Sequence, residues 1–200
     1  MGWLGPLTGI LFVVVAVISF ALQGEPPDVT EDSAAEIVDF YADNKDEVMF
    51  GAALQTVAAT LLVFFGGVLR RVLRAAEGEG GTLSLVVFGG TVILAAGSAL
   101  DATINFGLAE TADDIDPSAA QALMALWNND FLLFALGTQV LFIALGVSIV
   151  RHGAFPAWIG WISILLGVIA VTPIGFAGFI GGSILVLIMS GMLLMRSRAA

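Results

Sequence analysis

Six stretches of the chain are long and apolar enough to cross a lipid bilayer, and this feature limits the fold more than any other. A helix needs about 20 apolar residues to cross the hydrocarbon core. Because backbone amides in lipid must be hydrogen-bonded within their own segment, we expect each stretch to be an α-helix. The sequence therefore predicts an all-α fold, with one six-helix transmembrane domain over residues 1–200. The expected spans are Trp3–Leu22, Val48–Leu69, Leu83–Ala102, Phe131–Val150, Ala154–Thr172 and Phe176–Met195.

The composition agrees with a membrane environment and excludes several classes of protein. Hydrophobic residues make up 58% of the chain and charged residues 12%, against about 25% charged residues in soluble proteins. The absence of cysteine excludes disulfides and thiolate metal sites. The single histidine, His152, excludes a histidine metal cluster, and the single lysine, Lys45, lies between spans, where no retinal-type Schiff base can form. We therefore expect no metal and no cofactor.

The charged residues predict the orientation in the membrane. Because Lys and Arg stay on the cytoplasmic side, we expect both termini in the cytoplasm of a multi-pass protein in the plasma (inner) membrane. The loops 23–47 and 103–130 are then the outer loops, and both are acidic. The net charge of −10 disfavours nucleic acid as a partner, since that needs a basic surface. Six of the seven basic residues fall on the predicted cytoplasmic side: Arg70, Arg71, Arg74, Arg151, Arg196 and Arg198.

The first apolar stretch has an alternative interpretation as a signal peptide. Ser19-Phe20-Ala21 resembles a small-residue cleavage site. No Lys or Arg precedes the stretch, however, and its apolar run is longer than a usual signal core. We expect an uncleaved span.

Each predicted outer loop contains a pattern typical of a short amphipathic helix. In the first, Ser33 and Glu36 form a capping box, and in the second, Asp116 is a suitable N-cap before Pro117. We expect both helices to lie on the outer face, with their apolar sides towards the bundle or the lipid. For the first loop, the alternative to a helix is a solvated connection. For the second loop, the alternative to a separate helix is an extension of the fourth span. The apolar stripes at helical spacing are Ala34, Ile37, Val38 and Tyr41, and then Ala120, Leu123, Met124 and Trp127.

The same order of features occurs twice and suggests an internal repeat. Ser33-Ala34-Ala35-Glu36 recurs as Ser118-Ala119-Ala120-Gln121, 85 residues later. With one residue deleted, Gln55 aligns with Gln139. Spans one and two would then match spans three and four in a parallel repeat, as found in some transporters. The alternative is chance similarity between apolar sequences of low complexity.

Four polar residues form the candidate ligand-binding site: Gln55, Asp101, Asn105 and Gln139. Both glutamines are expected roughly 10–12 Å below the outer surface of the membrane. A buried amide without partners costs free energy, so we expect both to face inwards and to be hydrogen-bonded. Two interpretations stay open. In the first, these groups form interhelical hydrogen bonds that hold the bundle together, and Asp101 is an ordinary acid at the membrane interface. In the second, they form a polar pocket that opens to the outside.

An enzyme is poorly supported by the residues. No pair of carboxylates lies within a span, and no serine or aspartate lies in a nucleophile motif. His152, beside Arg151 at the end of the fourth span, is expected to complement the dipole of its helix rather than to act in catalysis.

One segment resembles a known family. Gly153-Ala154-Phe155-Pro156-Ala157-Trp158-Ile159-Gly160-Trp161, together with the six-span layout and the acidic loop beginning at Pro26-Pro27, is similar to a widespread bacterial family of small integral membrane proteins of unknown function. The resemblance covers nearly the whole chain. It implies a six-helix plasma-membrane protein, and it supplies no activity, ligand or catalytic residue.

The sequence thus favours a non-enzymatic membrane protein that binds a lipid, a small apolar molecule or a partner helix within the bundle. The alternative is a small transporter or channel with an outward-facing polar pocket. A transporter needs a polar path through both leaflets, whereas the inner halves of the predicted spans contain mainly Gly, Ala and aliphatic residues.

Overall fold

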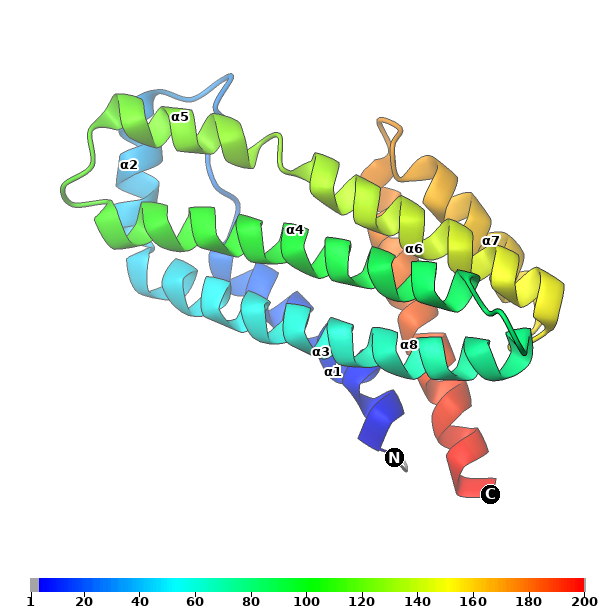
Figure 1. The fold of residues 1–200 in the computed structure, drawn as a ribbon. Coiled ribbons are helices and arrows are strands. Elements are labelled where there is room, and N and C mark those ends of the chain that lie inside the picture. The colour runs from blue at the N-terminus through cyan, green and yellow to red at the C-terminus, as the bar shows by residue number, and fades with distance from the viewer. Residues whose placement is uncertain (1–3, 200) are drawn as a thin grey trace.

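The computed structural model describes residues 4–199, in which all regular secondary structure is helical (Figure 1). Trp3, the expected first residue of the first span, lies outside the described residues. The helices are α1 (Leu4–Gln23), α2 (Ala34–Asp43), α3 (Lys45–Glu77), α4 (Leu83–Thr111), α5 (Pro117–Trp127), α6 (Phe131–His152), α7 (Ala157–Ile169) and α8 (Gly175–Ala199).

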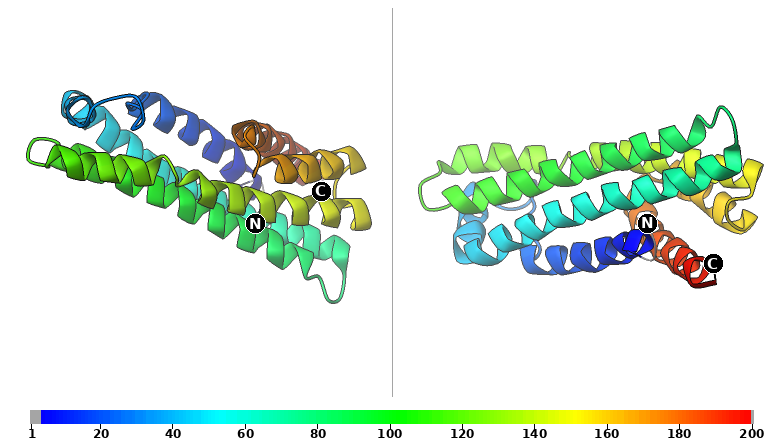
Figure 2. Two further views of the ribbon diagram at one scale, coloured as in Figure 1. Left: turned by 90° about the horizontal axis from the view of Figure 1, so that it is seen from above. Right: turned by 60° about the horizontal axis from the view of Figure 1, so that its bottom comes forward.

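Helices α1, α3, α4, α6, α7 and α8 pack as a closed ring. The helices α2 and α5 lie together at one end of it (Figures 1 and 2). Around the ring, α1 packs on α3, α3 on α4, α4 on α6, α6 on α7, α7 on α8, and α8 again on α1. The described chain is therefore one bundle whose first and last helices are neighbours.

Five helices are long and apolar enough to cross a membrane, which makes the chain a multi-pass membrane protein; they are α1, α3, α4, α6 and α8. The helix of the fifth expected span, Ala154–Thr172, is shorter than predicted. This helix, α7, begins only after Pro156 and ends at Ile169. With 13 residues, it is about 20 Å long. The six-span count is therefore not confirmed.

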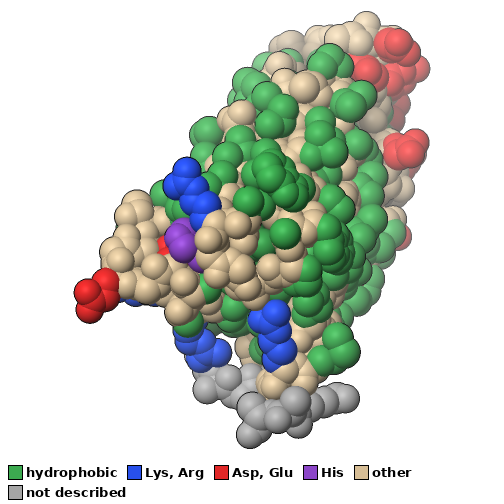
Figure 3. Space-filling view, turned by 90° about the vertical axis from the view of Figure 1, so that its right-hand side faces the viewer, with side chains coloured by type: hydrophobic (Ala, Val, Ile, Leu, Met, Phe, Trp, Pro, Cys, Tyr) green, Lys and Arg blue, Asp and Glu red, His purple; other side chains and the backbone are tan. Residues whose placement is uncertain are grey.

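The charged residues gather at opposite ends of the bundle. The basic end contains Arg70, Arg71 and Arg74 at the end of α3, and Arg151 at the end of α6. Figure 3 looks onto this end, with the histidine in the foreground, most acidic side chains at the far end and hydrophobic side chains between. We call the far end, formed by α2, α5 and the loops beside them, the acidic end. Which end faces the cytoplasm stays a prediction.

Both ends of the described chain belong to the basic end. The α1 residue Gly5 lies against Val68 of α3, two residues before Arg70. In α8, Arg196 donates a hydrogen bond to the carbonyl of Ala154 and lies 5.2 Å from the centre of the Phe155 ring. The two termini are thus on the same side of the bundle, as the sequence predicts.

A half-buried carboxylate joins three helices at the basic end. Glu77, the last residue of α3, accepts a hydrogen bond of 3.2 Å from the backbone N–H of Ser84 in the first turn of α4. Its other oxygen accepts a 2.6 Å hydrogen bond from the Ser148 hydroxyl of α6. An acid near a helix N-terminus is favourable because it meets unpaired N–H groups.

The two predicted short helices are confirmed. The side chains of Ser33 and Glu36 form the reciprocal capping box at the start of α2, and Asp116 caps α5 with Pro117 at the first position. Their apolar sides face the bundle and each other. Ile37 and Tyr41 of α2 pack with Ala120 and Met124 of α5 in an apolar cluster that also includes Leu108 of α4.

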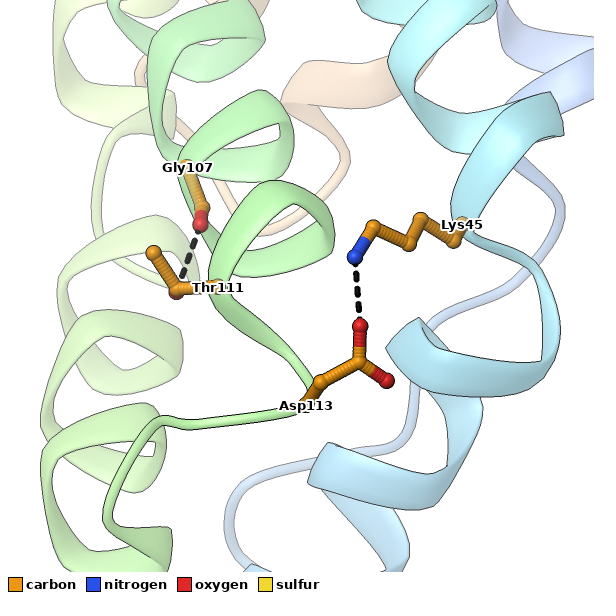
Figure 4. Close-up of polar contacts among 4 residues, drawn as sticks. All are labelled: Lys45, Gly107, Thr111 and Asp113. Atoms are coloured by element: carbon orange, nitrogen blue, oxygen red, sulfur yellow. Dashed lines mark hydrogen bonds and ion pairs between the residues drawn. The ribbon is translucent and has the colours of Figure 1, made fainter.

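An ion pair connects the start of α3 to the loop after α4. Figure 4 shows the Lys45 ammonium reaching the Asp113 carboxylate, at 2.6 Å. In the same view the Thr111 hydroxyl donates to the Gly107 carbonyl within the last turn of α4. The Lys45 side chain is partly exposed and that of Asp113 is largely exposed, and such surface pairs contribute little to stability because water screens them. The main consequence of this ion pair is that Lys45, the one lysine of the sequence, already has an acidic partner.

Glycines allow α4 and α6 to touch backbone to backbone. Gly90 of α4 lies against the backbone of Leu141, and Gly137 of α6 lies against the backbone of Leu94. A Cβ atom at Gly137 would be 2.5 Å from the Leu94 nitrogen. Small residues at such crossings let membrane helices gain dispersion energy along their length.

We expect Gly137→Ala to destabilise the protein because the added methyl group must push α4 and α6 apart. Overpacking of this kind costs about 1–3 kcal/mol. Thermal unfolding in detergent should show a lower midpoint than the wild type. The matched control is Gly89→Ala, at a position of α4 where a Cβ meets nothing within 4 Å. Equal midpoints for the two variants would contradict this account of the helix contact.

The first turn of α2 should depend on pH. Hydrogen bonds from the Ser33 backbone N–H and hydroxyl lower the pKa of Glu36. A carboxyl whose pKa is lower in the folded state stabilises the fold above its unfolded pKa of about 4.3, and this contribution is lost as pH falls through the folded pKa. We expect amide exchange in the first turn, corrected for intrinsic rates, to accelerate below about pH 4. The same pH dependence in Glu36→Gln would contradict this assignment.

Candidate binding site

A chain of buried polar side chains crosses the bundle near the acidic end, and Gln55 of α3 is its centre. The Gln55 side chain is only 1% exposed. Its carbonyl oxygen accepts a 2.8 Å hydrogen bond from the amide of Gln23 in α1, and its amide donates a 2.6 Å hydrogen bond to the Asp101 carboxylate in α4. One amide thus joins three helices and satisfies a buried charge.

The α1 end of this chain depends on a close helix crossing. The Ser19 hydroxyl donates to the backbone carbonyl of Gly51 at 2.8 Å, and the Gln23 amide donates to the Ser19 oxygen at 3.0 Å. A Cβ atom at Gly51 would lie 2.7 Å from Gln23 Cγ. The glycine therefore lets α1 approach close enough for both hydrogen bonds.

The other end of the chain reaches the short helices. Asn105, one turn after Asp101 on α4, accepts a 2.7 Å hydrogen bond from the Tyr41 hydroxyl of α2. The same hydroxyl lies 3.3 Å from the Met124 sulfur of α5. Burial, and to a smaller extent the charge of Asp101, raises the pKa of the Tyr41 phenol, so this group stays a donor. The side-chain nitrogen of Asn105 donates a 3.3 Å hydrogen bond to the backbone carbonyl of Asp101.

A second carboxyl group meets Asp101 from the opposite side. Asp130, just before α6, interacts with Asp101, as does Trp127 at the end of α5. Asp130 is 9% exposed, and its Oδ2 atom has no hydrogen-bond partner among the described residues. The indole nitrogen of Trp127 is likewise buried without a partner of normal geometry. The network is complete on the Gln55 side of Asp101 and incomplete on the Asp130 side.

A cavity of about 460 Å³ begins where the network is incomplete. Its polar side chains are Asp101, Asp130, Thr138 and Thr172, and the turn between α7 and α8, including Pro173, forms one edge. Five phenylalanines from α1, α6 and α8 supply most of the apolar walls: Phe20, Phe131, Phe134, Phe176 and Phe179. The cavity therefore combines an acidic end with an aromatic lining.

The structure brings together three of the four predicted site residues. Gln55, Asp101 and Asn105 belong to one network, whereas Gln139 of α6 is half-buried and forms no side-chain hydrogen bond with a described residue. Its neighbour Thr138 lines the cavity instead. Because Gln55 and Gln139 have unlike surroundings, the internal repeat is not confirmed.

Sequence reasoning did not select Ser19, Gln23 or Asp130 as site residues. Ser19 and Gln23 are spaced i, i+4 at the end of a span that is otherwise apolar, and this spacing could have identified them. Asp130 resembled one more acid of the outer loop, because only the fold brings it beside Asp101. In the described residues, no three His, Cys, Asp or Glu side chains are placed to hold a metal ion.

Replacing Gln55 and Gln139 should have different effects on stability. Gln55→Leu removes two buried hydrogen bonds, one from the Gln23 amide and one to the Asp101 carboxylate, and this loss costs about 1–3 kcal/mol. Gln139→Leu removes no hydrogen bond between described residues, so we expect a change within about 0.5 kcal/mol. Unfolding by heat or denaturant in detergent measures both. Equal losses in the two variants would contradict the central place of Gln55.

Comparison with known proteins identifies a family and no activity. A family model described as a domain of unknown function (DUF4386) matches residues 7–197. Searches of curated proteins and of solved structures gave no match. The match agrees with the expectation of an uncharacterised family. Since it covers nearly the whole chain, the protein belongs to the DUF4386 family.

Proposed function

We propose that this protein is a non-enzymatic binding protein of the membrane, which holds a small, largely apolar molecule in the cavity beside Asp101. The observation that carries the proposal is the cavity itself, at about 460 Å³. Small-molecule sites usually measure about 300–1,000 Å³, with apolar walls and a few convergent polar groups. Phenylalanines and the Asp101–Asp130 pair provide this combination.

The surroundings of the cavity support access from the lipid. Phe131 and Phe176, at its rim, are largely exposed in the bundle. In a membrane these side chains contact lipid, so an apolar ligand can reach the cavity sideways without passing through water. The turn between α7 and α8 at the rim contains Pro173 and no charged residue.

The two interpretations of the polar residues apply to different parts of the network. Gln55 and Asn105 have hydrogen-bond partners on other helices, so we assign them to holding the bundle together. Such bonds typically contribute about 0.6–2 kcal/mol each. Asp101 and Asp130 line the cavity, so we assign ligand contact to them. With the acidic end outside, as the basic residues predict, the cavity faces the outer leaflet.

Binding is favoured over transport because the basic half of the bundle is filled with apolar side chains. A continuous cluster from six helices includes Phe65 of α3, Leu145 of α6 and Met189 of α8, all buried. A polar substrate crossing this region would lose its hydrogen bonds. The transporter alternative therefore needs a second conformation in which this cluster opens.

Native mass spectrometry of the gently extracted protein tests the proposal. We expect the wild type to retain a small molecule and Ala135→Phe, which fills the cavity wall, to lose it. Ala53→Phe adds the same side chain at an exposed position and should retain the molecule. Thermal unfolding of all three proteins checks that they are folded.

Retention by all three proteins would place the molecule elsewhere and contradict the proposed site. Retention by none, with all three folded and with pentylbenzene added as an apolar probe, would contradict the proposed function.

A further inference from the structure

The cavity has two acidic groups and no basic group to balance them. Asp101 and Asp130 both line it, and none of its lining residues is Lys, Arg or His. The lysine of this end, Lys45, already pairs with Asp113 at 2.6 Å. The described residues therefore supply hydrogen bonds to the acid pair but no positive charge.

One oxygen atom of the pair has no hydrogen-bond partner among the described residues. Asp130 is only 9% exposed, so water cannot readily reach it. Its Oδ2 atom is nevertheless without a hydrogen-bond partner among the described residues. Two carboxyl groups that line one cavity with apolar walls repel each other, unless a proton or a cation lies between them. A cation also gives Asp130 Oδ2 the donor that it lacks among the described residues.

The aromatic lining suits a positively charged group on an apolar body. Phe179 is held edge-on against Phe20 and Phe134, with ring centres 6.3 and 6.0 Å apart. All three rings line the cavity. Faces of aromatic rings attract ammonium groups, and the attraction is larger away from water. The same rings provide the dispersion contacts for an apolar tail.

We propose that the cavity binds lipophilic amines in their ammonium form. The ammonium donates hydrogen bonds to Asp130 Oδ2 and offsets the charge of Asp101, while the apolar part lies among the phenylalanines. This inference rests on the proposed function and names the chemical class of its ligand. No bond is made or broken, and the amine is bound as the cation that predominates in water at neutral pH.

A pair of probes of nearly equal shape tests the role of charge. 4-Phenylbutylamine is a cation at neutral pH, and pentylbenzene replaces its ammonium group by a methyl group. Binding of each is measured by isothermal titration to the protein in nanodiscs of zwitterionic lipid, with empty nanodiscs subtracted. We expect the amine to bind about tenfold or more tightly, the size of one charge-assisted hydrogen bond.

Two variants locate the effect. Asp130→Asn keeps the shape of the side chain and should remove most of the preference for the amine over pentylbenzene. Asp114→Asn removes an equal charge from an exposed position at the same end and should leave the preference intact. Loss of the preference in both variants would indicate attraction by surface charge and would overturn the inference.

The remaining outcomes separate this inference from the proposed function. Equal binding of the two probes by the wild type would overturn the amine assignment and leave an apolar binding site. Binding of neither probe would overturn both.

Discussion

A carboxyl group kept away from water must be surrounded by hydrogen-bond donors, and the acidic end of this bundle is arranged around that requirement. Asp101 lies in a polar layer between two apolar clusters. One cluster fills the basic half of the ring, and the other joins α2 and α5 to the ends of α3 and α4. Gln55 connects the layer to α1, and Asn105 connects it to α2. The polar layer therefore fixes how the short helices and α1 are placed relative to α4.

The layer also explains why some polar residues belong to the framework and others to the cavity. On the side of α1 and α3, every described polar group has a partner, because Ser19, Gln23 and Gln55 bond in sequence. On the side of α6, the cavity that Asp101 lines also contains Asp130, whose Oδ2 atom has no hydrogen-bond partner among the described residues. The packing ends there, and phenylalanines surround the space that remains. The hydrogen-bonded framework and the cavity thus lie on opposite sides of one residue, Asp101.

The sequence predicted local structure well and contacts between distant helices poorly. The capping box of Ser33 and Glu36, and the Asp116-Pro117 start of α5, depend on neighbours within one turn, so the pattern is sufficient to identify them. The burial of Gln55 also followed from its depth in an apolar span. Its partners did not, because helical spacing gives the side on which a residue lies but not the helix that it meets. The prediction for Gln139 used the same reasoning as for Gln55, yet α6 places Gln139 outside the network. Asp130 could not be recognised because its role depends on the position of α6 relative to α4.

The shortness of α7 has a consequence for the lipid around it. Its 13 residues cover about 20 Å of a hydrocarbon layer about 30 Å thick. A bilayer adapts to a short hydrophobic segment by becoming thinner beside it. The turn that ends α7 contains Thr172 and Pro173, which lie at the rim of the cavity. Headgroups and their water are therefore expected close to this rim, so that the ligand we propose can keep its ammonium group hydrated until it reaches Asp130.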